Sequence, residues 1–268
     1  MTVVNWDELW KTKLLSTYRV DLTETNYWDK CAEGFNKKTT HMQNMTKNQL
    51  ERIKLLPEYT VIDIGAGTGR LTIPLAKRVK QITAIEPSPI MLSLLKSNAE
   101  KQNIQNIVPI NLTCQQLKVN ENIFPHDVVV ASFSLFMNDL SKTLQKIDAL
   151  ATKAVYLFSS ASRWLNEDLQ QIIHGDKLAV TCGDYIYMYN ILHDLGILAN
   201  VDVWNFEGKQ YYASLDDAVS HFMETYRIAA SRKEELRVYF KRMLINENGS
   251  LLFKQQKKAA LIWWTKTQ

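Results

Sequence analysis

Short apolar runs alternate with amphipathic stretches through the middle and the end of the chain. Runs of roughly four to eight mostly apolar residues predict strands. Residues 127–132 are apolar on both faces, as expected for a central parallel strand. The predicted strands cover residues 60–64, 81–85, 107–112, 127–132, 154–158, 200–206 and 258–264.

Helical patterns fill the intervals between these strands. Ser88 and Pro89 predict a helix start, with the serine as N-cap and the proline at the first helical position. Residues 185–195 predict another helix, which Gly196 ends. Because strands and helices alternate, we expect an α/β fold with a mostly parallel sheet of seven strands and right-handed crossovers.

Two helical regions lie outside this alternation. We expect residues 1–45 to form an aromatic-rich helical cap, and residues 46–268 to form the main domain with a helical insertion at about 213–246. In the insertion, Ser214 and Ser231 each precede a helical pattern with an acidic residue three positions later, which predicts capping boxes. The insertion either packs as core or covers the substrate pocket.

The composition is typical of a folded enzyme. The chain has 268 residues, a hydrophobic fraction of 46% and a formal charge of +4. It lacks a signal-peptide pattern and any run of about 18 apolar residues, so we expect a cytoplasmic protein without a membrane partner. Cys31, Cys114 and Cys182 are widely spaced and no histidine pair has ligand spacing, which predicts free thiols and no metal site.

The most informative motif is residues 61–69, where an apolar strand runs into glycines at alternate positions. Glycines allow a tight turn and a close approach of backbone to ligand, and the next strand ends on Glu86. Arg70 stands where a dinucleotide fingerprint has its third glycine, and no Gly-Lys-Ser/Thr follows. The pattern therefore predicts a site for a nucleoside cofactor rather than a dinucleotide or a nucleoside triphosphate.

Residues 61–69 and Glu86 resemble the first motif and the acidic second-strand end of the class I S-adenosylmethionine-dependent methyltransferases. The resemblance covers about residues 59–158. It implies a Rossmann-like sheet with helices on both faces and an antiparallel last strand. It also implies that residues 63–69 wrap the methionyl end of S-adenosylmethionine, that Glu86 bonds both ribose hydroxyls, and that S-adenosylhomocysteine is the product. The cofactor-binding residues that we expect are Asp63, Gly65, Ala66, Gly67, Thr68, Gly69, Glu86, Pro87, Cys114, Gln115, Gln116, Ser132, Phe133 and Trp28.

Adenine recognition departs from the family pattern. Family members carry an acidic side chain after the third strand, and that position falls near Cys114. The side-chain oxygen of Gln115 or Gln116 could accept the adenine amino group instead, or both could be solvated loop residues.

The segment after the fourth strand is expected to border the methyl group, because open α/β sheets bind ligands at the carboxyl edge. Ser132 and Phe133 lie there, and the segment lacks the Asn/Asp-Pro-Pro-Tyr/Phe pattern of enzymes that methylate nucleic-acid amino groups. No catalytic residue is assigned. His41, Asp139 or a tyrosine of residues 185–189 could act as general base.

Aromatic residues concentrate before the predicted sheet. Trp28 and Tyr18 are candidates for a lid over the sulfonium, since a cation is attracted to an aromatic face by roughly 1 kcal/mol. Alternatively, these side chains dock the segment on the core.

Three functions remain compatible with the sequence. The first is methyl transfer to a small, partly apolar molecule, with nucleic acid an unexpected partner. The second is a protein or RNA methyltransferase, favoured by basic residues within 232–258. The third is a cofactor-binding protein without turnover. The oligomeric state and the methylated atom are left open.

Overall fold

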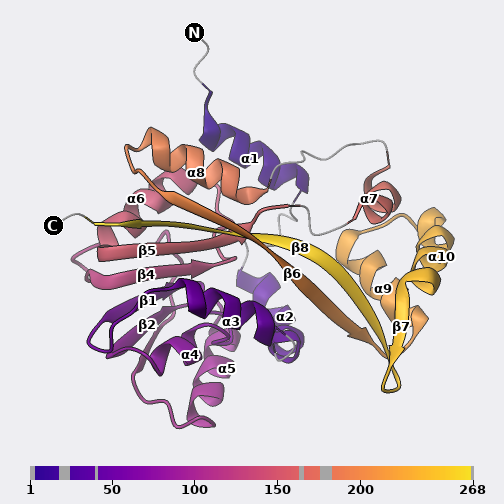
Figure 1. The fold of residues 1–268 in the computed structure, drawn as a ribbon, viewed down its shortest axis with the longest axis horizontal. Coiled ribbons are helices and arrows are strands. Elements are labelled where there is room, and N and C mark those ends of the chain that lie inside the picture. Colours follow the sequence, from indigo (N-terminus) through magenta and orange to yellow (C-terminus); the bar gives the residue numbers. More distant parts are fainter. Residues whose placement is uncertain (1–3, 18–24, 40–41, 163–165, 176–182, 267–268) are drawn as a thin grey trace.

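One twisted sheet separates two groups of helices, and a pair of its strands extends well beyond this body (Figure 1). The structure, a computed structural model, describes residues 4–17, 25–39, 42–162, 166–175 and 183–266.

The sheet runs in the order β3-β2-β1-β4-β5-β8-β6, and β7 pairs with β8 off this path. β1 to β5 pair in parallel, and β8 is antiparallel to β5, β6 and β7. The strands are β1 (Thr60–Ile64), β2 (Gln81–Ile85), β3 (Ile107–Ile110), β4 (His126–Ser132), β5 (Ala151–Ser160), β6 (Asn200–Tyr212), β7 (Leu244–Glu247) and β8 (Ser250–Thr265). The α/β class and the reversed last strand are confirmed. The strand order changes direction between β1 and β4, which is where such sheets leave room for a ligand.

Strand alternation sends side chains into a separate core on each face. In β1, Ile62 and Ile64 join a core with α1, α6 and α8, whereas Val61 joins a core with α3 and α4. Both layers are visible in Figure 1. The helices of the body are α1 (Trp6–Thr17), α2 (Thr25–Thr39), α3 (Gln43–Arg52), α4 (Thr72–Ala76), α5 (Pro89–Glu100), α6 (Leu140–Leu150) and α8 (Asp184–Asp194).

A second lobe is built on the extended part of β6 and β8. It contains α7 (Glu167–His174), α9 (Leu215–Tyr226), η2 (Ala230–Arg232), α10 (Lys233–Met243) and β7. Its core is separate from the two sheet cores and centres on the ring contacts of Phe222, Phe240 and Phe253. The lobe adds an eighth strand to the seven that we expected, because β7 pairs with β8 immediately after α10.

One of the two capping predictions for this lobe is wrong. Ser214 caps α9, and its hydroxyl accepts a hydrogen bond from the backbone N–H of Asp217 at 3.0 Å. Ser231 instead lies within η2, and α10 starts at Lys233 without a side-chain cap. The short helix displaces the start of α10 by one residue, so that Arg232 takes the N-cap position in place of Ser231.

Three helices precede β1, and each is fixed to a different part of the body. Trp10 of α1 donates its indole N–H to the carbonyl of Met137 at 2.8 Å, and Asp29 of α2 bonds the Ser88 hydroxyl. The division into a cap (1–45) and a main domain (46–268) stays a prediction. In the part of the chain that the structure describes, no helix combines the length and the apolar character needed to cross a bilayer.

Candidate functional site

The three glycines of the loop after β1 have different surroundings, although all have positive φ (+73°, +55° and +91°). A Cβ on Gly65 would lie 2.3 Å from the Ser134 Cβ, and one on Gly69 would lie 3.0 Å from Ile73. At Gly67, the nearest atom would be a ring carbon of Phe35 at 3.6 Å. Gly65 and Gly69 therefore serve packing, whereas an added Cβ at Gly67 would make only ordinary contacts, with Phe35 and Met91.

Glu86 lies beside Gly67 at the end of β2. Its side chain is buried and accepts hydrogen bonds from the backbone N–H groups of Gly67 at 2.8 Å and Ser88 at 2.9 Å. Burial raises the pKa of this carboxyl, and the two N–H donors oppose the rise. Each carboxylate oxygen keeps an unused lone pair, so Glu86 can accept two further hydroxyl groups.

Asp63 lies under the loop rather than at its surface. The Thr72 hydroxyl donates to its carboxylate at 2.6 Å, which ties β1 to the start of α4. Burial raises the pKa of Asp63 to about 6, while Thr72 and the guanidinium of Arg70 lower it. Asp63 thus fixes the loop through a buried hydrogen bond, and its contact with the cofactor stays a prediction.

Arg70 joins the loop to α3 and β4, a role that sequence reasoning missed. Its guanidinium donates to the side chains of Thr46, Gln49 and Ser132, each at 2.8 Å. Gln49 also donates to the Ser132 hydroxyl at 2.9 Å. Ser132, which we expected at the cofactor, is therefore a junction between the loop, α3 and β4.

The backbone turns sharply where β4 ends. Phe133 has φ +54°, a left-handed conformation that is unfavourable for an aromatic residue. It is held there because its N–H donates to the carbonyl of Phe158. The hydroxyl of the following residue, Ser134, donates to the Ile64 carbonyl. Strain of this kind concentrates at functional sites. The partly buried ring of Phe133 packs against the core formed with α3 and α4, and its contact with a ligand stays a prediction.

Helix α2 covers the glycine loop. Phe35 is the α2 side chain nearest to Gly67, and Trp28 stacks edge-to-face on Phe35 with ring centroids 6.1 Å apart. Tyr27 packs against Trp28 in the same way. Trp28 is thus part of an aromatic cover, with Phe35 as the member in closest contact. Tyr18, the other lid candidate, lies outside the described residues.

Of the three residues predicted on the adenine side, Gln115 and Gln116 are exposed and Cys114 is buried. Cys114 is buried in the sheet core, where burial raises the pKa of its thiol to about 11. The side-chain oxygen of Gln116 accepts from the Thr113 N–H at 2.8 Å and closes its own turn. The backbone carbonyl of Gln115 accepts a hydrogen bond from the Lys146 ammonium at 3.0 Å, whereas its exposed side chain has no recorded hydrogen bond among the described residues. This geometry favours Gln115 over Gln116 as the acceptor.

Pro87 and Asn111 connect the ends of β2 and β3. The Asn111 amide donates to the carbonyls of Glu86 and Pro87, each at 2.9 Å. Asn111 was missed because nothing in its sequence surroundings marks it. Its two bonds fix the backbone that presents Glu86.

The candidate bases differ in position. His41 lies outside the described residues. Asp139 is exposed just before α6, whereas Tyr187 is buried in contact with the rings of Trp6 and Trp10. Tyr187 is a packing residue, and the catalytic assignment stays open.

Comparison with known proteins agrees with this geometry. Residues 61–153, from β1 to the start of β5, match the family model of a methyltransferase domain. An uncharacterised protein of Haemophilus influenzae is 27% identical and covers 97% of this chain and 96% of its own length. A probable ribosomal RNA small subunit methyltransferase A of Methanosphaera stadtmanae is 41% identical over 58 residues, which is 22% of this chain and 21% of that protein. Because a ribosomal RNA methyltransferase is among the relatives, our expectation that nucleic acid is an unlikely partner is not supported.

Two solved structures illustrate the shared fold. YcgJ of Bacillus subtilis has a TM-score of 0.55 at 15% identity, covering 85% of this chain and 98% of that one. A coclaurine N-methyltransferase bound to N-methylheliamine and S-adenosylhomocysteine has a TM-score of 0.51 at 14% identity, covering 98% and 95%. The strand order, the glycine loop and the match over residues 61–153 agree with one another. Together they support the class I S-adenosylmethionine-dependent methyltransferase family for this chain, with residues 61–153 as the part that matches the family model.

Proposed function

We propose that this S-adenosylmethionine-dependent methyltransferase acts on a small-molecule acceptor. The observation that carries the proposal is the cover over the carboxyl edge of the sheet. Helix α2 lies on the glycine loop through Phe35, and α1 is fixed to the segment after β4 through Trp10. Covered sites exclude water and suit compact ligands better than polymer segments.

The residues around Gly67 fit the cofactor. In this proposal the methionyl end lies against the loop backbone at Gly67, and the Glu86 carboxylate, which already accepts the Gly67 N–H, also accepts the ribose hydroxyls. Gln115 is our candidate for the adenine amino group. Phe133 would border the methyl group from the end of β4.

The bound cofactor supplies a methyl group on a positively charged sulfur, whose transfer is an in-line displacement. The chain's residues align the two reactants and exclude water, and such alignment can supply most of the acceleration. In the proposed cofactor site, Phe35 and Trp28 provide the apolar cover on one side, and the strained turn at Phe133 borders the site on the other side.

The acidity of Glu86 predicts a pH-dependent affinity for S-adenosylmethionine. Because burial raises its pKa above the ordinary 4.5, the carboxyl takes up a proton at a pH where a solvated glutamate is still ionised. Protonation removes charge and acceptor capacity, so affinity should fall as pH decreases. Calorimetry from about pH 8 down to about pH 4, below the ordinary glutamate pKa, measures this fall.

Two variants distinguish the contribution of Glu86 to the pH dependence from that of Asp63. Glu86→Gln should bind weakly with little pH dependence, whereas Asp63→Asn should retain the slope although Asp63 has a pKa of about 6. Wild-type affinity that is flat over the whole range would exclude Glu86 as the ribose acceptor.

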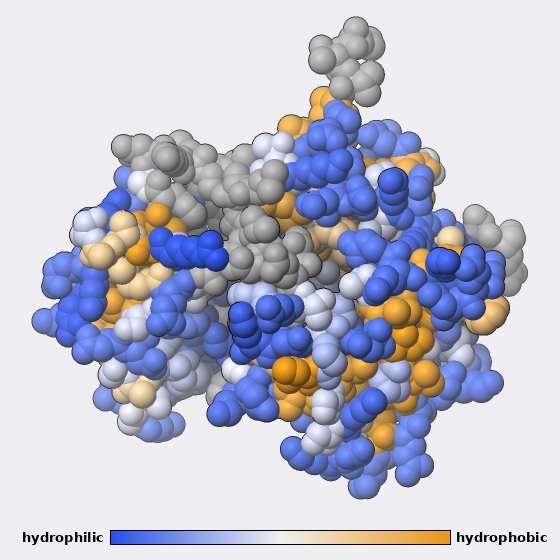
Figure 2. Space-filling view, turned by 180° about the vertical axis from the view of Figure 1, so that it is seen from behind, coloured by the Kyte–Doolittle hydropathy of each residue, from blue (hydrophilic) through white to orange (hydrophobic). Residues whose placement is uncertain are grey.

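An RNA acceptor is the second candidate, favoured by the ribosomal RNA methyltransferase among the relatives. The basic residues of α10 give it little support, because several are neutralised within the lobe. Arg237 pairs with Asp216, and Arg242 pairs with Asp168 at 2.6 Å. Figure 2 shows one face on which hydrophilic residues surround separate apolar groups, without a continuous apolar surface.

A labelled-methyl experiment distinguishes the two candidates. The enzyme is incubated with labelled S-adenosylmethionine and with either the small-molecule filtrate or the macromolecular fraction of a cell extract. We expect label in the filtrate, and none with Gly67→Val as the matched control. Label in ribonuclease-sensitive material, together with RNA binding that weakens steeply with salt, would instead establish the RNA acceptor.

A further inference from the structure

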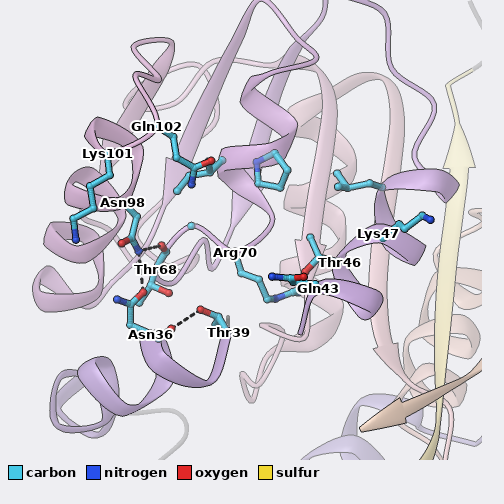
Figure 3. A pocket seen from close by; sticks show the side chains of 14 residues that line it. Asn36, Thr39, Gln43, Thr46, Lys47, Thr68, Arg70, Asn98, Lys101 and Gln102 are labelled. Atoms are coloured by element: carbon cyan, nitrogen blue, oxygen red, sulfur yellow. Dashed lines mark hydrogen bonds between the residues drawn. The ribbon is translucent and has the colours of Figure 1, made fainter. Parts of the chain in front are cut away.

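A cavity of about 490 Å³ lies behind the glycine loop, enclosed by α2, α3, α4 and α5 (Figure 3). Its size is within the range of small-molecule sites, roughly 300–1,000 Å³. Thr68, Gly69 and Arg70 form its wall toward the loop, and Lys101 and Gln102 lie at the far end of α5.

This cavity is distinct from the cofactor crevice. Gly67, Glu86, Phe35 and Phe133, to which we assign the cofactor, do not line the cavity, although Thr68 and Gly69, which we also expected at the cofactor, do. The described lining residues also include no aromatic side chain on which a nucleobase could stack. The cavity is therefore unsuited to the adenosine half of the cofactor.

The polar groups of the cavity suit a hydroxylated ligand. The Thr68 hydroxyl is buried, with the residue 2% exposed, and finds no hydrogen-bond partner among the described residues. Such a group is costly unless a ligand or water satisfies it. Asn98 donates to Asn36 at 2.8 Å and to the Thr68 carbonyl at 3.0 Å, which leaves the Asn98 oxygen and the Asn36 nitrogen for a ligand. Figure 3 shows this pair on one side and Gln43 and Arg70 on the other.

The charge of the cavity suits an anion. Lys101 is exposed at the end of the cavity beside Asn98, Lys47 is exposed at the opposite end, and no described lining residue is acidic. The acidic group that contacts a rim lysine is Glu51, 3.9 Å from the Lys47 ammonium, and this exposed pair is weak. Arg70 adds a third positive charge at the inner wall, where Asp63 partly balances it.

We propose that this cavity is a second binding site, and that it takes a small polyol carrying a phosphate group. Lys101 holds the phosphate at the rim, at the end of the cavity where Thr68, Asn36 and Asn98 bond the hydroxyls inside. The site does not depend on which acceptor the enzyme methylates.

Calorimetry with glucose 6-phosphate tests the proposal, with glucose and inorganic phosphate as component probes. We expect glucose 6-phosphate to bind more tightly than either component, both without cofactor and with saturating S-adenosylmethionine. Lys101→Glu should weaken binding about tenfold or more, because it reverses a charge at the rim. Lys96→Glu is the matched control, since Lys96 is an exposed lysine of the same helix that does not line the cavity.

Three results would overturn the proposal. The first is that glucose 6-phosphate does not bind up to about 10 mM. The second is that Lys96→Glu and Lys101→Glu weaken its binding equally, and the third is that glucose 6-phosphate competes strictly with S-adenosylmethionine. Competition would assign the anion to the cofactor site. None of these results bears on methyl transfer, so the second site and the proposed function fail separately.

Discussion

Gly67→Val should reduce the affinity for S-adenosylmethionine by at least about 100-fold, below what calorimetry detects. The expected cause is steric. The backbone at Gly67 has φ +55°, and the added side chain would project toward Phe35, into the space assigned to the cofactor. Valine is also branched at Cβ, which makes this backbone conformation unfavourable and displaces the N–H that bonds Glu86.

Gly249→Val provides the matched control for backbone strain. Gly249 has φ +83° in the turn between β7 and β8, with no atom within 4 Å of an added Cβ. It should lower the melting temperature much as Gly67→Val does but leave cofactor affinity within about twofold. If both variants lost affinity equally, general destabilisation would explain the effect and the assignment of Gly67 would be wrong.

The sheet body was predictable because its strands are buried on both faces. β1 and β2 begin and end where the apolar runs do. β3 ends two residues earlier than predicted, since Asn111 turns away to bond the carbonyls of Glu86 and Pro87.

The second lobe was harder to predict from local pattern. β8 runs through Lys254, Gln255, Gln256 and Lys257, polar residues that do not suggest a strand, because here it belongs to a ribbon outside the body. β7 was missed for a similar reason. It follows α10 without a turn residue and is defined by its pairing with β8.

The candidate site likewise has one part that the sequence predicts and one part that it does not. The loop glycines and Glu86 stand in one local motif, and we could identify them before any contact was known. The network of Arg70, Gln49 and Ser132 joins three elements, and Phe35 meets Gly67 across 32 positions of sequence (67 minus 35). Such contacts depend on how helices dock on the sheet, which hydrophobic periodicity does not specify.

Glu86→Ala should weaken S-adenosylmethionine binding by about 100-fold, or roughly 3 kcal/mol, if two charge-assisted hydrogen bonds to ribose are lost. The variant also frees the N–H groups of Gly67 and Ser88, which loosens the loop. Because this loosening is confined to one loop, the melting temperature of the cofactor-free protein should change only slightly. The rise in melting temperature that the cofactor produces should fall much more. Calorimetry and thermal unfolding with and without cofactor measure both effects.

The ribose itself supplies the sharpest control for this assignment. An S-adenosylhomocysteine analogue without the two ribose hydroxyls should bind the wild-type protein and Glu86→Ala with similar affinity, because the interaction in question is absent in both. Glu100→Ala, an exposed carboxylate at the end of α5, should behave as wild type toward both ligands. If Glu86→Ala weakened the analogue as strongly as the intact nucleoside, Glu86 would act only by holding the loop, and the ribose would be bound elsewhere.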